Sequence, residues 1–190
     1  MHMAIAATDK KHWTAADWQA LPSDGNRYEI IDGELFVTPA PSYDHQDAVV
    51  LLLLQIRPYV RAHAIGATTI SPADVEFGGD TVVQPDLFVT SLVNGKRPRN
   101  WSDIRGLVLA VEVLSPSTAR VDRTRKRALY QRECVPEYWI VDVDARVVER
   151  WRPEDTRPEI VTERLEWQPD SAQPPLVLDL AALFAAIHDE

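Results

Sequence analysis

One acid, Glu112, interrupts an otherwise unbroken apolar run that extends from Leu107 to Leu114. A run this apolar and this short is typical of a β-strand that neighbouring elements cover on both faces. An acid inside such a strand loses its hydration, so a partner must stabilise its charge or its pKa must rise. The run therefore predicts a buried strand with a functional or paired carboxyl group at Glu112.

A second acid, Asp86, follows Pro85 in a segment that we predict to be a strand over residues 81–90. A purely structural interpretation is a turn after the proline, a position where aspartate is common. Aspartate is disfavoured within strands, so a mid-strand position favours a functional role instead. Glu112 has a structural alternative too, a buried ion pair with a base of the next helix, although desolvation leaves such a pair little net gain. Both alternatives stay open at this point.

Two carboxylates on neighbouring strands indicate a divalent cation. At ~4 Å and an effective dielectric of ~20 they repel by about 4 kcal/mol, and a cation between them reverses that sign. Mg²⁺ accepts one or two carboxylates together with waters and a phosphate oxygen. Zinc requires His or Cys ligands at close spacing, and the five histidines and one cysteine form no such cluster. The pattern favours magnesium facing a phosphate.

A basic helix is predicted from residue 121 to residue 132. Asp122, Lys126 and Tyr130 are spaced by four residues and therefore share one face. That face is either solvated, with an Asp122–Lys126 ion pair of about 0.3–0.5 kcal/mol, or it directs Lys126 at the two carboxylates. There the ammonium would orient a water or stabilise a pentacovalent phosphate. Three arginines of this helix are candidates for contacts with flanking phosphates: Arg123, Arg125 and Arg127.

The composition is that of a single folded domain, which we expect to span residues 1–190 with a flexible tail at 1–12. The chain has 45% hydrophobic residues and six tryptophans, which argues against global disorder. The net charge of −9 and the pI near 5.0 count against broad affinity for nucleic acid. Screening over roughly 8–10 Å still permits a local basic surface.

The location is expected to be the cytoplasm. The single cysteine, Cys134, forms no intramolecular disulfide, which fits a reducing compartment. The first ten residues lack the apolar core of a signal peptide, and the apolar stretch from Val49 to Leu54 is far shorter than a membrane span. We therefore expect a soluble protein without a membrane partner.

The order of elements predicts a mixed α/β fold. Asp32-Gly33 lies between two strand-like runs and is a preferred two-residue hairpin turn, because both positions need positive φ. The helix at 42–64 is apolar around most of its surface, so we expect it to be buried against a sheet, with Pro58 kinking or ending its first part. The remaining expected elements are helices at 14–21 and 180–187, the latter capped by Asp179; strands at 68–77 and near 160–165; a turn at 78–80; an exposed loop at 91–103; and a second hairpin of strands 138–142 and 146–151.

Taken together, these residues resemble the PD-(D/E)XK nuclease superfamily and, more closely, the family of Uma-type putative restriction endonucleases. The resemblance extends from about residue 17 to residue 184. The matching pieces are residues 28–35, His45, Pro85-Asp86, residues 111–118, Asp122 with Lys126 and Tyr130, and residues 137–142.

The resemblance implies a restriction-endonuclease-like core, a mixed β-sheet flanked by α-helices, here with N-terminal and C-terminal β-hairpins. It implies metal ligation by Asp86, Glu112 and the carbonyl of Val113. The superfamily has a lysine two residues after the second acid, and this chain has Leu114 there. Lys126 could bring an ammonium into the same space from the next helix.

The leading hypothesis is a Mg²⁺-dependent endonuclease that hydrolyses DNA phosphodiester bonds, with Mn²⁺ as the alternative ion. Glu29 is either an outward hairpin residue or a support for a second ion or a water, and His45 is interpreted as structural. One rival is a catalytically degenerate nuclease-fold module that binds nucleic acid or a protein partner. Another is a phosphohydrolase acting on nucleotides. Symmetric cutting of duplex DNA would favour a homodimer, but no residue marks an interface.

Overall fold

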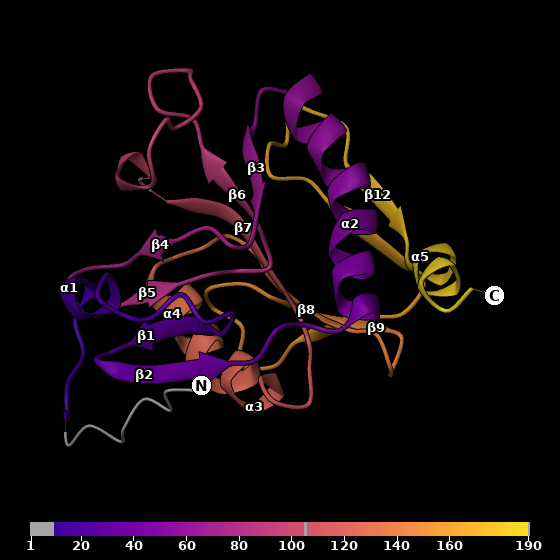
Figure 1. Ribbon diagram of the computed structural model, residues 1–190. Helices are drawn as coiled ribbons and strands as arrows, with labels where there is room; N and C mark the ends of the chain where they lie inside the picture. The colour runs from indigo at the N-terminus through magenta and orange to yellow at the C-terminus, as the bar shows by residue number, and fades with distance from the viewer. Residues whose placement is uncertain (1–9, 105, 190) are drawn as a thin grey trace.

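The β-strands form two larger sheets and one hairpin in the computed structural model, which describes residues 10–104 and 106–189 (Figure 1). The strands are β1 Arg27–Ile31, β2 Glu34–Thr38, β3 Gly66–Ile70, β4 Val75–Glu76, β5 Val82–Val83, β6 Leu87–Ser91, β7 Leu107–Val113, β8 Tyr138–Asp142, β9 Val147–Trp151, β10 Glu159–Val161, β11 Arg164–Trp167 and β12 Leu176–Asp179. A six-stranded sheet has the order β10-β9-β8-β7-β6-β3, and a four-stranded sheet has the order β2-β1-β5-β4. In the larger sheet β7 and β8 are parallel, which makes it a mixed sheet.

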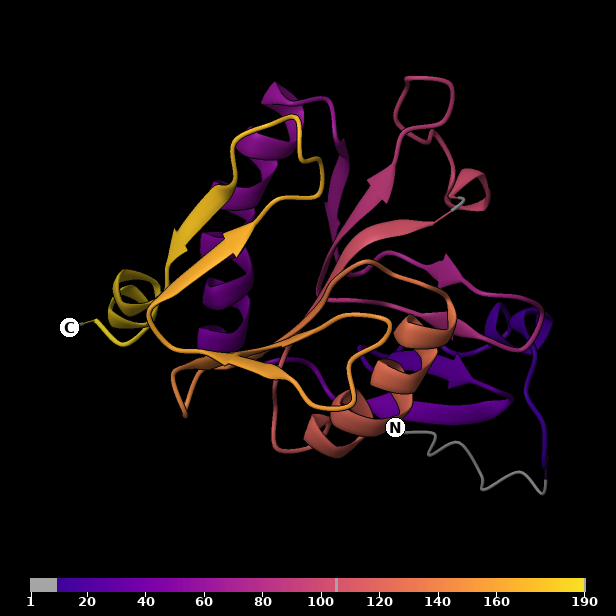
Figure 2. The ribbon, with the colours of Figure 1, turned by 180° about the vertical axis from the view of Figure 1, so that it is seen from behind.

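Helices cover both faces of the larger sheet (Figures 1 and 2). They are α1 Ala15–Trp18, α2 Tyr43–Ala62, the short 3₁₀ helix η1 Trp101–Asp103, α3 Ala119–Val121, the π-helical turn η2 Asp122–Lys126, α4 Arg127–Arg132 and α5 Leu180–Ile187. On one face, α2 packs with Leu87, Leu109 and Val111 in one apolar cluster. On the other face, α4 packs with Phe88 and Ala110 in a second cluster. The sheet is therefore buried on both sides, as the apolar run of β7 predicts.

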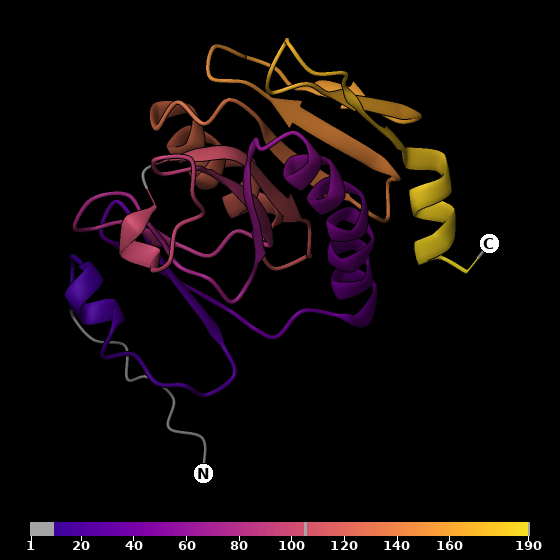
Figure 3. The same cartoon turned by 90° about the horizontal axis from the view of Figure 1, so that it is seen from above.

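The C-terminal segment forms an outer layer over α2. Seen from above, α2 lies between the larger sheet and α5 (Figure 3). Phe184 of α5 and Trp167 of β11 belong to the same apolar cluster as Leu52 and Ile56 of α2. Asp179 begins α5 by accepting a hydrogen bond from the Ala182 amide at 2.9 Å, so the predicted cap is confirmed.

The N-terminal hairpin is confirmed at the predicted bounds. Asp32 and Gly33 both have positive φ, 52° and 78°, and β1 pairs with β2 in the register Ile31↔Glu34. These values match the two-residue turn that the Asp-Gly pair predicts.

Replacing Gly33 by alanine is expected to lower the free energy of unfolding by about 1–2 kcal/mol, because an L side chain is strained at positive φ. The new Cβ would also meet the His12 ring at 2.1 Å, so that side chain would have to move. Urea denaturation measures the loss. Gly79→Ala is the matched control, because Gly79 has no positive φ and no atom within 4 Å of the added Cβ. Equal losses in the two variants would contradict the assigned turn.

Several predicted strands are broken in the structure. The segment 68–77 divides into β3 and β4 at Ser71-Pro72, and the segment 81–90 divides into β5 and β6 at Gln84-Pro85-Asp86. The two pieces of each segment belong to different sheets. Proline supplies no N–H to a ladder, so each break falls at a proline. The strand expected near 160–165 likewise divides into β10 and β11, and β12 was not predicted.

The predicted helices also differ in detail. Pro58 lies inside α2 without ending it, and α2 is buried along one side only, with Leu54 64% exposed. The helix expected from residue 121 begins at Ala119 and contains the π-helical turn η2. No described helix combines the length and apolarity needed to cross a bilayer. Of the predicted tail, residues 1–9 lie outside the described residues, while Lys10 forms an ion pair with Asp17.

Candidate functional site

Asp86 lies where the chain passes from the four-stranded sheet into the six-stranded one. It follows β5 and directly precedes β6, so the expected mid-strand position is wrong. Its Oδ2 atom accepts a hydrogen bond from the Val113 amide at 2.8 Å, and its side chain is 3% exposed. The carboxylate thus occupies the end of the β6–β7 ladder, where a further strand residue would otherwise pair.

Two basic side chains hold the Asp86 carboxylate. The Arg27 Nη1 atom from β1 lies 2.5 Å from Oδ1, and the His45 Nε2 atom from the first turn of α2 lies 3.1 Å from Oδ2. Ser42 places His45 by capping that turn, accepting a hydrogen bond from the His45 amide at 3.3 Å. Burial opposes ionisation of Asp86, but the hydrogen bond from His45 and the charge of Arg27 outweigh it and hold the pKa well below its usual range.

Glu112 lies in the middle of the molecule on β7 and has no measurable exposure. Its Oε1 atom accepts hydrogen bonds from the Lys126 ammonium at 2.9 Å and the Tyr130 hydroxyl at 3.3 Å. Its Oε2 atom is buried without a hydrogen-bond partner. Burial raises the pKa of Glu112 well above its usual value, although Lys126 partly offsets this effect.

The strand register brings Glu112 and Asp86 to the same place in the sheet. Leu87 of β6 is paired with Val111 of β7, so one step further along the ladder Asp86 stands opposite Glu112. The negative charge of Asp86 contributes to the raised pKa of Glu112. Arg27 contacts Asp86 alone of these two acids; burial opposes the charge of its guanidinium, but the charges of Asp86, Glu29 and Glu112 raise its pKa.

Lys126 is the cationic centre of the buried acids. Its Nζ atom lies 2.9 Å from Glu29 Oε1, 2.9 Å from Glu112 Oε1 and 3.6 Å from Asp122 Oδ1, and its exposure is zero. Burial alone would lower the pKa of Lys126, but Glu112, Glu29 and Asp122 raise it well above its usual value. Asp122 and Lys126 are the first and last residues of η2, and π-helical turns of this kind are frequent at functional sites.

The buried cluster holds more acidic than permanently basic side chains. Its four carboxyl groups face two permanent cations, Arg27 and Lys126, which leaves an excess of two negative charges when every acid is ionised and His45 is neutral. The four acids are Glu29, Asp86, Glu112 and Asp122, none more than 3% exposed. A hard divalent cation would balance this excess, and oxygen atoms are the ligands that it prefers.

The donor set fits such a cation, although it is not preassembled. Among the described residues, no three His, Cys, Asp or Glu side chains gather into a ready metal site. Asp86 and Glu112 supply two carboxylates, and the free Oε2 atom of Glu112 is a buried acceptor that needs a partner. In a β-strand the amide and the carbonyl of one residue point to the same neighbouring strand. The Val113 amide contacts Asp86, so the Val113 carbonyl points to the same side.

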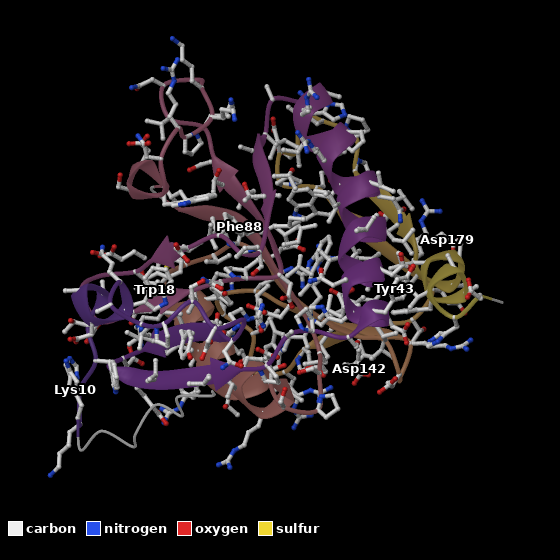
Figure 4. All side chains as sticks on the ribbon, in the orientation of Figure 1. Lys10, Trp18, Tyr43, Phe88, Asp142 and Asp179 are labelled. Carbon is white, nitrogen blue, oxygen red and sulfur yellow. The ribbon has the colours of Figure 1, made fainter. Side chains whose placement is uncertain are left out.

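A cavity of about 720 Å³ opens beside Asp86. Its wall includes Arg27, His45 and Asp86, together with Leu114 of the loop after β7. Glu112, Lys126 and Glu29 are not part of this wall and lie behind it. Asp142, at the end of β8, also lines the cavity and is labelled below the N-terminal end of α2 in Figure 4.

The three predicted phosphate-binding arginines point in different directions. Arg123 lines the cavity and forms ion pairs with Asp142 at 3.0 Å and Glu149 at 2.6 Å. Arg125 is paired with Glu34 at the surface, 2.9 Å away. The Arg127 guanidinium lies 5.0 Å from the centre of the Trp151 ring. Only Arg123 of the three therefore reaches the cavity.

Sequence reasoning did not single out Arg27, and it interpreted His45 as structural. Both contact Asp86 across 59 and 41 residues of chain, a pairing that no local pattern encodes. For His45, the available signal was its place in the ordered set of motifs that the resemblance rests on.

The comparisons with known proteins bear on the fold and on the family. A solved structure, the crystal structure of a putative nuclease belonging to DUF820 from Anabaena variabilis ATCC 29413, matches with a TM-score of 0.75 at 20% sequence identity, over 92% of this chain and 99% of that one. This likeness shows that the two chains share a fold. No curated protein matches the chain significantly. The model of the Uma2 family, described as "Putative restriction endonuclease", matches residues 15–184, so the chain belongs to the Uma2 family.

Proposed function

We propose that this protein is a metal-dependent nuclease that hydrolyses DNA phosphodiester bonds beside Asp86 and Glu112. The observation that carries the proposal is the excess of carboxyl groups over permanent cations in the buried cluster at the end of the β6–β7 ladder, next to an open cavity. The membership of the Uma2 family and the nuclease fold support the same reaction class. The ion we propose is Mg²⁺, with Mn²⁺ as a substitute.

Asp86, Glu112 and the Val113 carbonyl would hold the ion. A bound divalent cation lowers the pKa of a coordinated water and neutralises charge on the scissile phosphate. Ligation by Asp86 Oδ1 requires Arg27 to move away from that atom. The Arg27 side chain is 18% exposed and lines the cavity, so it has room to turn towards a phosphate. His45 would keep its contact with Oδ2 and fix the orientation of Asp86.

Lys126 would act behind the ligands as a positioning residue. Its ammonium contacts Glu112 Oε1 and so favours the ionised form with Oε2 free for an ion. Glu29 fixes Lys126 from the other side and accepts the Gln84 amide at 2.7 Å, one step from Pro85-Asp86. The earlier hypothesis that Lys126 orients the attacking water requires the ammonium to reach the cavity. In this structure its neighbours enclose it.

A second candidate function has one specific observation in its favour. Both oxygens of Asp86 are engaged by Arg27, His45 and the Val113 amide, which is the arrangement expected of a site that has lost its metal. The protein would then be a nuclease-fold module that binds nucleic acid without cutting it. Cytoplasmic location and a homodimer stay predictions of the sequence.

Purified protein is expected to cut plasmid and single-stranded DNA with Mg²⁺ or Mn²⁺ and to leave both intact with EDTA. In parallel, isothermal titration with Mg²⁺ and no DNA present is expected to show binding that Glu112→Gln removes. Glu76→Gln is the matched control, because Glu76 is an exposed acid on β4, outside the cluster. Cation binding without cleavage of any DNA would favour a different phosphoester substrate. Absence of carboxylate-dependent binding would establish the non-catalytic module instead.

A further inference from the structure

A second cavity, of about 740 Å³, lies at the opposite end of β3 from Asp86. The C-terminal part of α2 and the loop between β6 and β7 form its two sides, and these segments flank the start of β3 at the top of Figure 1. Four arginines line it: Arg57, Arg61, Arg97 and Arg99. Among the described residues no acid lines it, in a chain whose net charge is −9.

All four arginines are exposed, and none forms an ion pair with another described residue. The nearby acid in the loop between β6 and β7, Asp103, contacts backbone amides of the lining residues: it accepts hydrogen bonds from Arg99 at 3.2 Å and Asn100 at 3.0 Å. Elsewhere on the protein, exposed bases such as Arg125 and Arg132 pair with acids, at 2.9 and 2.8 Å. Four unpaired guanidinium groups around one cavity repel one another, so an anionic ligand that they share would be stabilising.

The other lining groups indicate a nucleic-acid strand. Trp101 is 52% exposed at the rim, although a tryptophan this large is usually well buried. An exposed indole beside arginines is a stacking surface for an unpaired base. Thr69 and Asn100 also line the cavity. These groups can donate to phosphate and sugar oxygens.

The two cavities lie near opposite ends of β3. Gly66 at the start of β3 lines the arginine cavity, and Ser71 just past its end lines the cavity beside Asp86. Five residues of strand span about 17 Å, which is roughly five base steps of 3.4 Å along one strand. One nucleic-acid strand of modest length can therefore reach both cavities.

We propose that the arginine cavity binds backbone phosphates of a single-stranded stretch of nucleic acid, with Trp101 stacking on a base. The proposal rests on the proposed function only for the claim that the same strand reaches Asp86. It gives the protein a substrate-holding site several nucleotides away from the reacting phosphate, on a chain whose overall charge repels nucleic acid.

The test measures binding rather than cleavage. Fluorescence anisotropy of a short fluorescein-labelled single-stranded oligonucleotide is followed with EDTA present, from about 50 to 200 mM NaCl, to give the slope of log K against log[salt]. The double variant Arg97→Gln with Arg99→Gln is expected to reduce that slope by roughly 1.4, about 0.7 per lost contact, and to weaken binding at low salt on the order of tenfold or more. Arg57→Gln with Arg61→Gln should do the same from the helix side.

Two further variants separate the contributions. Trp101→Ala is expected to weaken binding on the order of tenfold without changing the salt slope, because stacking releases no counterions. Arg157→Gln with Arg164→Gln removes the same charge from exposed positions outside the cavity and is expected to change neither quantity. Equal effects of this control and the Arg97/Arg99 pair would overturn the proposal, and so would wild-type protein that binds no oligonucleotide.

Competition identifies the ligand class. A nucleoside monophosphate that displaces the oligonucleotide at a comparable nucleotide concentration would overturn strand binding in favour of a mononucleotide site. Cleavage with Mg²⁺ is scored separately. Wild-type cleavage together with an unaffected Arg97/Arg99 variant would refute this inference and leave the proposed function standing. Binding that depends on these arginines, without cleavage of any DNA, would support this inference and refute the proposed function.

Discussion

Asp86→Asn is expected to reduce Mg²⁺-dependent DNA cleavage by a factor on the order of 10³ while the protein stays folded. Asparagine keeps the shape of the side chain, and its amide oxygen can still accept the Val113 amide that Oδ2 accepts at 2.8 Å. It lacks the negative charge that a cation and Arg27 both require. The measurement is the initial rate of plasmid nicking, and circular dichroism follows the folded state.

The control for this substitution is Asp170→Asn, an exposed aspartate in the loop before β12, which is expected to cleave at the wild-type rate. Titration calorimetry adds a second readout, since Asp86→Asn should also lose the heat of Mg²⁺ binding. Cleavage at the wild-type rate by a folded Asp86→Asn protein would remove Asp86 from the site. The cation would then have to be held elsewhere.

Lys126→Met is expected to lower the free energy of unfolding by about 3–5 kcal/mol, the usual cost of removing one partner of a buried ion pair. Methionine fills similar volume, so the loss comes from charge rather than from a void. Glu29 and Glu112 each lie 2.9 Å from the ammonium, and neither has water to replace it. Urea denaturation monitored by tryptophan fluorescence measures the change.

The adjacent base supplies the matched control. Arg125→Met removes a cation one residue earlier in the same helix, where the side chain is 56% exposed and pairs with Glu34, so little stability should be lost. The double variant Lys126→Met with Glu112→Gln is expected to recover part of the stability, because one uncompensated charge disappears with its partner. A Lys126→Met protein as stable as the Arg125→Met protein would mean that water reaches these acids.

Local chemistry accounts for the parts of the fold that the sequence predicted correctly. The turn at Asp32-Gly33 and the cap at Asp179 each depend on a few adjacent residues, so pattern and structure agree to the residue. The shared face of Asp122, Lys126 and Tyr130 also follows from spacing alone, and all three are buried. The burial of β7 follows from its composition.

The remaining features depend on contacts between distant segments. Apolar residues flank Gln84-Pro85-Asp86 on both sides, and although Pro85 marks a break, no local pattern reveals that β5 and β6 join different sheets. Arg27 contacts Asp86 because the N-terminal hairpin lies beside the break between β5 and β6. His45 contacts Asp86 because the start of α2 lies beside the same break. Such placements are set by packing of whole elements, which a residue pattern does not describe.

The contact between Arg27 and Asp86 bears on the order of events during synthesis of the protein. A nascent chain that had to gather several bare carboxylates would need its ion at the moment of folding. Here a guanidinium from the first hairpin already neutralises Asp86, so closing the core does not require a cation at this carboxylate. Under the proposed function, an ion would therefore bind after folding, by displacing Arg27 from the Asp86 carboxylate.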